Sequence, residues 1–207
     1  MRKQLATLLF FGSIWGLLEA TLGYALHFLP ILISGSIMFP LAAIILMMAE
    51  KKLKSPWSLM WIGLIAASIK SINFLMPGLL PIKTYNPMIA IMIQSLVMVG
   101  VVFIAKKSPQ GITMLALGLV SFLWRGLFLI NDVINHQITG FNFPQLASMD
   151  ATIEFMWVYG SMGGLFLIVL YLGWIKLQKR VTLTWNPRLA FSLGMMILAM
   201  LATYFIH

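Results

Sequence analysis

The sequence predicts an all-α fold, a polytopic membrane helix bundle of six or seven transmembrane helices with a cytoplasmic N-terminus. Of the 207 residues, 61% are hydrophobic and 9% are charged, and the mean hydropathy is +0.97. A water-soluble domain cannot cover its surface with so few charges, so we expect an integral membrane protein in contact with the lipid bilayer. No polar domain interrupts the apolar runs, and residues 1–207 are therefore expected to form a single integral membrane domain.

Apolar runs long enough to cross a bilayer occur throughout the chain. They cover roughly residues 5–28, 31–49, 56–76, 87–105, 111–134, 152–175 and 188–206. A six-span protein would result if the last run lay in the interface, but its apolar composition favours a seventh span. Asn86 and Pro87 are expected to begin the fourth span, as an N-cap followed by proline in the first helical position.

The basic residues indicate the orientation of the spans. Only Lys83 is expected on the outer side, and Lys70 and Arg125 fall within spans. The other eleven share one side: Arg2, Lys3, Lys51, Lys52, Lys54, Lys106, Lys107, Lys176, Lys179, Arg180 and Arg188. Because basic loops remain in the cytoplasm, this side is expected to be cytoplasmic. The net charge of +9 is explained by these loops, so we expect no nucleic-acid partner.

Sequence signatures of catalysis are absent. The chain has no cysteine, which excludes disulfides, thiolate metal sites and cysteine nucleophiles. It contains no H-E-x-x-H, G-x-S-x-G or P-loop motif. Asp132 and His136 are four residues apart, but one such pair is a weak metal signal. We therefore expect no catalytic residue, no cofactor and no metal site, and a transport protein rather than an enzyme.

A glycine stripe in the first span carries that span's only carboxylate. At about 100° per residue, Gly12, Gly16, Glu19 and Gly23 fall within about 60° of one another. Transmembrane helices approach closely along such stripes, and an intramembrane carboxylate is costly unless it is paired or wetted. Glu19 is therefore expected to face a neighbouring helix or a cavity.

The third span repeats this spacing with the opposite charge. Gly63, Ala67 and Lys70 follow the pattern of the first stripe, with Lys70 in the place of Glu19. Each charged residue lies 16 positions beyond a cytoplasmic lysine (19 − 3 and 70 − 54), roughly 24 Å into the membrane. We therefore expect these two helices to pack together, with Glu19 and Lys70 at one level. The pair is either structural or part of a binding site.

Polar residues collect in the outer halves of the spans, above inner halves that are almost wholly apolar. A channel needs polar groups along its full depth, so this distribution favours a pocket that opens outward. Arg125 is expected either to pair across helices or to meet an anionic ligand group. The longest outer loop, about 136–151, is either a lid or an ordinary connector. The predicted substrate-binding residues are Glu19, Lys70, Asn73, Arg125, Asp132, Trp15, Trp124 and Glu154, and Tyr24 and Trp157 are further candidates for stacking on a ring.

The chain resembles the substrate-binding S components of energy-coupling-factor vitamin transporters. The resemblance rests on the length, the basic helix connections, Gly12-x3-Gly16-x3-Ala20 and the segment Tyr85-Asn-Pro-Met-Ile-Ala90. It implies vitamin uptake across a bacterial or archaeal plasma (inner) membrane, by a multi-pass protein. It also implies that the first-span stripe contacts a transmembrane coupling subunit with ATPases. S components usually have six helices, and a seventh span departs from that pattern.

The favoured function is therefore binding and uptake of a small polar solute, vitamin-like or heterocyclic. The predicted pocket has nearly balanced charges, which suits a zwitterionic or neutral ligand. One alternative is a structural or assembly subunit of a membrane complex, in which buried charges only lock the helices. Another is an enzyme acting on lipid in the outer leaflet, with Glu154, Asp132 and His136 as acid and base groups.

Overall fold

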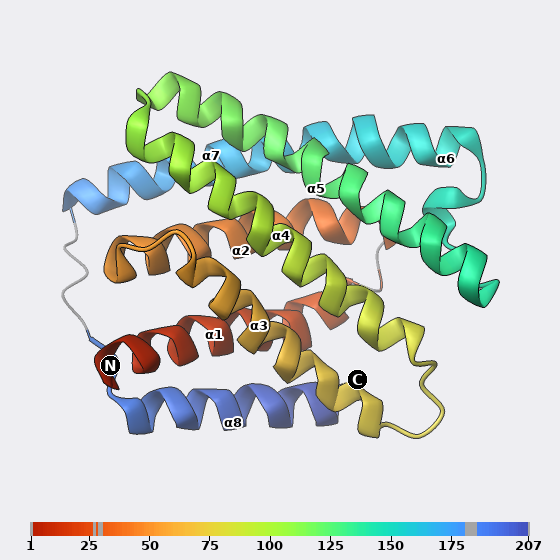
Figure 1. The fold of residues 1–207 in the computed structure, drawn as a ribbon, viewed down its shortest axis with the longest axis horizontal. Coiled ribbons are helices and arrows are strands. Elements are labelled where there is room, and N and C mark those ends of the chain that lie inside the picture. The colour runs from red at the N-terminus through yellow and green to blue at the C-terminus, as the bar shows by residue number, and fades with distance from the viewer. Residues whose placement is uncertain (1, 27, 29–30, 181–185, 207) are drawn as a thin grey trace.

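The structure is a computed structural model, and 89% of it is helical (Figure 1). The part of the chain that the structure describes contains no strand. Those residues are 2–26, 28, 31–180 and 186–206. The long helices are α1 (Arg2–Leu26), α2 (Ile31–Leu53), α3 (Ser58–Lys70), α4 (Ile82–Lys107), α5 (Gln110–Thr139), α7 (Tyr159–Arg180) and α8 (Leu189–Ile206). The short elements are η1 (Ser71–Leu75), η2 (Pro144–Leu146), α6 (Met149–Ile153) and the π-helical turn η3 (Glu154–Val158).

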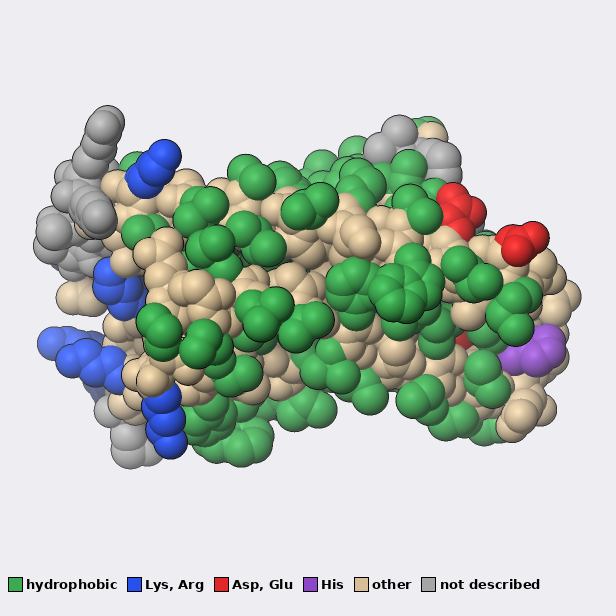
Figure 2. Space-filling view, turned by 90° about the horizontal axis from the view of Figure 1, so that it is seen from above, with side chains coloured by type: hydrophobic (Ala, Val, Ile, Leu, Met, Phe, Trp, Pro, Cys, Tyr) green, Lys and Arg blue, Asp and Glu red, His purple; other side chains and the backbone are tan. Residues whose placement is uncertain are grey.

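Seven helical segments in the described residues are long and apolar enough to cross a membrane. The sixth of them, Met149–Gln178, runs through α6, η3 and α7. The predicted fold class, an all-α membrane bundle, is confirmed, and the chain is a multi-pass membrane protein. On the face shown in Figure 2, the Lys and Arg side chains lie at one end of the molecule, and the acidic and histidine side chains lie toward the other.

Six of the spans form a closed ring. The contacts run from α1 to α3, α4, α5, α7 and α2, and α2 returns to α1. Helix α8 lies outside this ring along α1 (Figure 1), where the Ser192 hydroxyl donates to the Ala6 carbonyl over 2.7 Å. The seventh span is therefore an addition to a six-helix ring, and α1 is covered by α2, α3 and α8.

Helices α1 and α3 pack together, as predicted from the glycine stripe of α1. A Cβ on Gly12 would lie 2.6 Å from Ile65 Cγ2, and one on Gly16 would lie 2.7 Å from Ile69 Cδ1. Only glycine leaves room for these isoleucines. The corresponding glycine of α3 does not contribute to this contact, because a Cβ on Gly63 would collide with Ser95 of α4.

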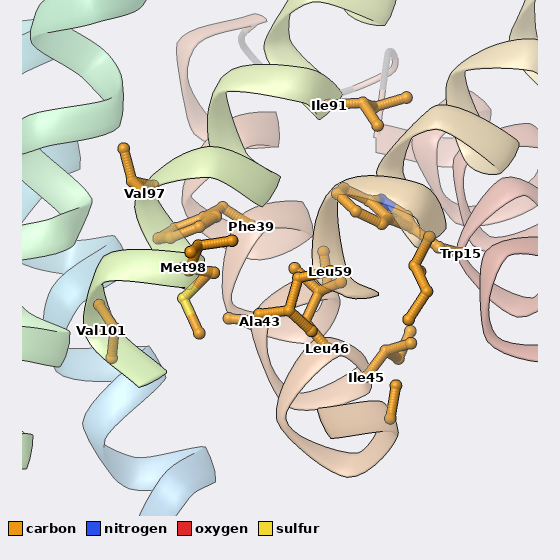
Figure 3. Packing of buried hydrophobic residues seen from close by; sticks show 14 of the residues in the cluster. Trp15, Phe39, Ala43, Ile45, Leu46, Leu59, Ile91, Val97, Met98 and Val101 are labelled. Atoms are coloured by element: carbon orange, nitrogen blue, oxygen red, sulfur yellow. The ribbon is translucent and has the colours of Figure 1, made fainter. Parts of the chain in front are cut away.

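The end of the ring nearer the basic residues is filled by apolar side chains (Figure 3). Phe39, Leu46, Leu59 and Met98 are fully buried there. Helix α4 begins at Ile82 rather than at Pro87, so the predicted N-cap at Asn86 is wrong. Pro81 is the actual N-cap, and its carbonyl accepts from the backbone N–H groups of Thr84 and Tyr85. Asn86 is therefore one turn inside the helix, where its side chain is available for contacts with other elements.

Candidate functional site

A cavity of about 1100 Å³ occupies the half of the bundle away from the basic end. Its walls come from α1, α2, the end of α3, η1, α4 and α5, and the segment 141–145 adds a further wall. Tyr204 of α8 and Phe155 of η3 also line it. The polar outer half and apolar inner half predicted from the sequence thus correspond to a real hollow above a packed core.

Glu19 and Lys70 line the same cavity. The Lys70 side chain is only 6% exposed, and Glu19 is half-buried. Glu19 Oε1 accepts a hydrogen bond of 3.1 Å from Trp15 Nε1. The two charges interact electrostatically. Their side chains do not form a direct ion pair, however. The direct ion pair in the described residues joins Lys106 Nζ and Glu50 Oε1, at 2.7 Å.

Three residues of the cavity wall each have a buried polar atom without a partner. Asn73 Oδ1, Gln94 Oε1 and Trp124 Nε1 have no hydrogen-bond partner, and all three residues line the cavity. A buried polar atom left unpaired costs about 1–3 kcal/mol, and native proteins usually satisfy such atoms. A molecule in the cavity could bond these two acceptors and one donor only after their side chains rotate, because the three atoms are themselves buried.

Arg125 is completely buried, and it forms no ion pair across helices with an acidic side chain of the described residues. Its guanidinium carbon lies 4.8 Å from the ring centre of Trp124 and 4.7 Å from that of Phe155. Nη2 donates to the Ser36 hydroxyl over 2.8 Å, and Ser36 donates to the Tyr159 carbonyl over 2.9 Å. Arg125 is not in the cavity wall. It lies behind Trp124 and Phe155, which are.

Asp132 is also fully buried, but it serves a network that joins α4, α5 and the outer loop. It accepts from Asn86 Nδ2 over 3.1 Å and from Gln145 Nε2. Asn131 Nδ2 donates to Asn86 Oδ1 over 2.6 Å. Asn86 and Gln145 line the cavity, whereas Asp132 supports them from behind.

The long outer loop closes one side of the cavity. Helix α5 ends at Gly140, whose positive φ of 67° favours glycine, and the Gly140 N–H donates to the His136 carbonyl. The Ser148 hydroxyl caps α6 by accepting from the Ala151 N–H. Between these two caps, Phe143 and Gln145 are buried against the cavity.

The predicted site residues thus fall into three groups. Glu19, Lys70, Asn73 and Trp124 line the cavity. Trp15, Arg125 and Asp132 stand behind its wall, each bonded to or stacked on a lining residue. Glu154 was predicted to contact the solute, but it is exposed outside the cavity and accepts from Tyr159 Oη over 3.1 Å.

The aromatic candidates divide in the same way. Tyr24 lines the cavity, whereas Trp157 is 66% exposed on the outside of the bundle. The proposed acid and base groups of a lipid enzyme do not meet either. Asp132 is buried in its amide network, His136 Nδ1 contacts the Phe141 carbonyl at 2.9 Å, and Glu154 bonds Tyr159. None of the three lines the cavity.

Sequence reasoning missed Gln145, Asn86, Phe155 and Ser36. Gln145 follows Phe141-Asn-Phe-Pro144, and an aromatic loop without basic residues was the available signal. Ser36 and Phe155 are ordinary residues for a membrane helix, and only the packing of α2, α5 and η3 brings them to Arg125. Comparisons with protein-family models, curated proteins and solved structures find no match to this chain.

Proposed function

We propose that this chain is a membrane-embedded protein that binds a small polar solute and takes part in its uptake. The observation that carries the proposal is a large cavity, three of whose lining residues, Asn73, Gln94 and Trp124, each hold a buried polar atom without a hydrogen-bond partner. A purely structural subunit gains nothing from unpaired groups that cost free energy. A solute that supplies the missing hydrogen bonds would recover that cost on binding.

The lining suits a solute with a flat ring and polar edges, consistent with a vitamin-like or heterocyclic compound. Trp124, Phe128, Phe141 and Phe155 offer apolar ring faces. Asn73 and Gln94 have unpartnered acceptors that rotation of their side chains would turn to the cavity, and Glu19 and Lys70 add one charge of each sign. Pockets for small molecules combine mostly apolar walls with a few polar groups in this way.

The chain contains no nucleotide-binding motif, so the energy for uptake would come from separate subunits or from a gradient. A coupling subunit with ATPases, as in the transporters that the sequence resembles, is one such source. The surface of α1 at Gly12 and Gly16 is already covered by Ile65 and Ile69 of α3. A coupling subunit would therefore bind a surface other than this stripe. We propose the plasma membrane of a bacterium or archaeon as the location, with the basic end in the cytoplasm.

The test is a thermal-unfolding screen of the detergent-purified chain against polar solutes. A solute at 100 times its Kd should stabilise the protein by about 2.7 kcal/mol. Asn73→Leu and Gln94→Met should remove that stabilisation. They should leave the solute-free protein as stable as before, or more stable by about 1 kcal/mol, because each removes an unpaired polar atom.

The matched control is Gln110→Met, the same replacement at an exposed position outside the cavity. It should leave solute binding unchanged. A screen in which no solute shifts the unfolding temperature would contradict the proposal. So would a shift that survives both cavity replacements.

A further inference from the structure

Arg125 has far more donors than partners. Its side chain is 0% exposed, and Nη2 bonds Ser36, but Nε and Nη1 have no partner. These two nitrogens carry three of the five N–H groups of a guanidinium. The Ser121 hydroxyl, one turn earlier on α5, is also buried and unpartnered. Arg125 and Ser121 therefore form a buried site rich in donors within the membrane span.

No acidic side chain of the chain neutralises Arg125. The chain has five acidic residues, and all of them are described in the structure. Glu50 pairs with Lys106, and Glu19 bonds Trp15. Asp132 accepts from Asn86 and Gln145, and Glu154 accepts from Tyr159. Asp150 is exposed at the start of α6. A buried guanidinium without a counter-charge is costly, so an anion from outside the chain would be strongly favoured here.

Only one layer of side chains separates Arg125 from the cavity. Trp124 and Phe155, whose rings both contact the guanidinium and lie at 82° to each other, both line the cavity. Gly35 also lines it, and a Cβ placed there would lie 3.7 Å from Arg125 Nη2. Phe155 belongs to the π-helical turn η3, an irregularity that is frequent at functional sites. A rotation of Phe155 would open Arg125 to the cavity.

We propose that Arg125 binds a carboxylate group of the solute, with Phe155 moving off the guanidinium to admit it. This inference rests on the proposed function and names the substrate class of the same cavity. A carboxylate is planar and can accept two parallel hydrogen bonds from a guanidinium. Its single charge balances that of Arg125, whereas a phosphate brings up to two charges and would leave a surplus of negative charge.

Two probes that differ only in charge test the proposal: pyridine-3-carboxylate and its amide, pyridine-3-carboxamide. In thermal unfolding of the full chain, the carboxylate should stabilise the protein more than the amide. Arg125→Gln should weaken carboxylate binding about 10- to 100-fold and leave amide binding unchanged. Arg188→Gln is the matched control, because Arg188 is exposed at the basic end and outside the cavity.

A measurement on the unmutated protein covers the case in which Arg125→Gln does not fold. Phenylglyoxal modifies guanidinium groups, and mass spectrometry locates the product. The carboxylate should slow modification of Arg125 and the amide should not, while Phe155→Ala should speed it. Equal stabilisation and equal protection by the two probes would overturn the role of Arg125 and leave the proposed function standing. No stabilisation by these probes or by any polar solute would overturn both.

Discussion

Gln145 and Asp132 are joined by a buried hydrogen bond that ties the outer loop to α5. Gln145 Nε2 donates to Asp132 Oδ2, and the other carboxylate oxygen accepts from Asn86 of α4. The Gln145 carbonyl in turn accepts from the Thr152 hydroxyl over 2.8 Å. Gln145 thus connects the wall formed by segment 141–145 to α5 through Asp132 and to α6 through Thr152.

Loss of the hydrogen bond between Gln145 and Asp132 should make the outer loop less stable. Gln145→Ala leaves a buried carboxylate oxygen without its donor, and should lower the free energy of unfolding by about 1.5–3 kcal/mol. Asn142→Ala, an exposed position in the same loop, should change it by less than about 0.5 kcal/mol. Chemical unfolding in detergent measures both, and limited proteolysis should cut residues 140–148 faster in Gln145→Ala. Similar behaviour of the two variants would show that the bond does not hold the loop.

Glu19 and Lys70 should be energetically coupled. Glu19→Gln and Lys70→Met should each destabilise the protein, and the double replacement should recover part of the loss, because it leaves no unbalanced charge. A double-mutant cycle on thermal stability should give a coupling of about 0.5–3 kcal/mol. The pair of half-buried Glu50 and exposed Lys106 serves as the comparison, with an expected coupling of about 0.2–1 kcal/mol.

Ligand binding by the double variant separates the two roles of the pair. If Glu19 and Lys70 hold the solute, the double variant should fold but lose solute binding. Strict additivity of the two single effects would mean that the charges do not act together. Recovery of both stability and binding would make the pair structural only.

Glycines in contact with a neighbouring helix should respond to alanine in the opposite sense to glycines that face open space. At Gly16 a Cβ would lie 2.7 Å from Ile69, so Gly16→Ala should cost about 1–3 kcal/mol of stability. At Gly100 of α4 no atom lies within 4 Å, so Gly100→Ala should be neutral or stabilising by up to about 1 kcal/mol. Thermal unfolding of the two variants measures the difference. A loss of stability at Gly100 equal to that at Gly16 would remove the close-packing explanation.

The basic end should face the cytoplasm. Single cysteines at Ser55 and Ser108 should stay unlabelled when intact cells are treated with a membrane-impermeant thiol reagent, and a cysteine at Gln137 should react. The chain has no native cysteine, so each signal reports one site. Labelling at residue 55 or 108 from outside would reverse the orientation and place the cavity on the cytoplasmic side.

Features of the fold that depend on the residues of a single span could be predicted from the sequence. Apolar runs specify the spans, and the stripe of Gly12 and Gly16 specifies a close helix contact. The face of α3 that fills this contact could not be predicted, because Ile65 and Ile69 are typical of any apolar helix. The spacing of Gly63 matches that of the α1 stripe, but Gly63 faces Ser95 of α4 and not α1.

The same limit applies to the site. A buried charge within a span marks Arg125 and Asp132 as important, but their partners lie on other elements. Phe155 reaches Arg125 only because η3 packs against α5, and Gln145 reaches Asp132 only because the loop folds back. Contacts between distant segments depend on helix rotation and tilt, which periodicity in one span does not determine.

The apolar packing below the cavity also affects passage across the membrane. Leu46, Leu59 and Met98 are fully buried between the cavity and the basic end, and no polar chain links the two in the described residues. Protons and ions need a wetted or polar route to cross a bilayer. In this conformation the packed apolar layer separates the cavity from the basic end, so a solute bound in the cavity could pass further only if the helices rearrange.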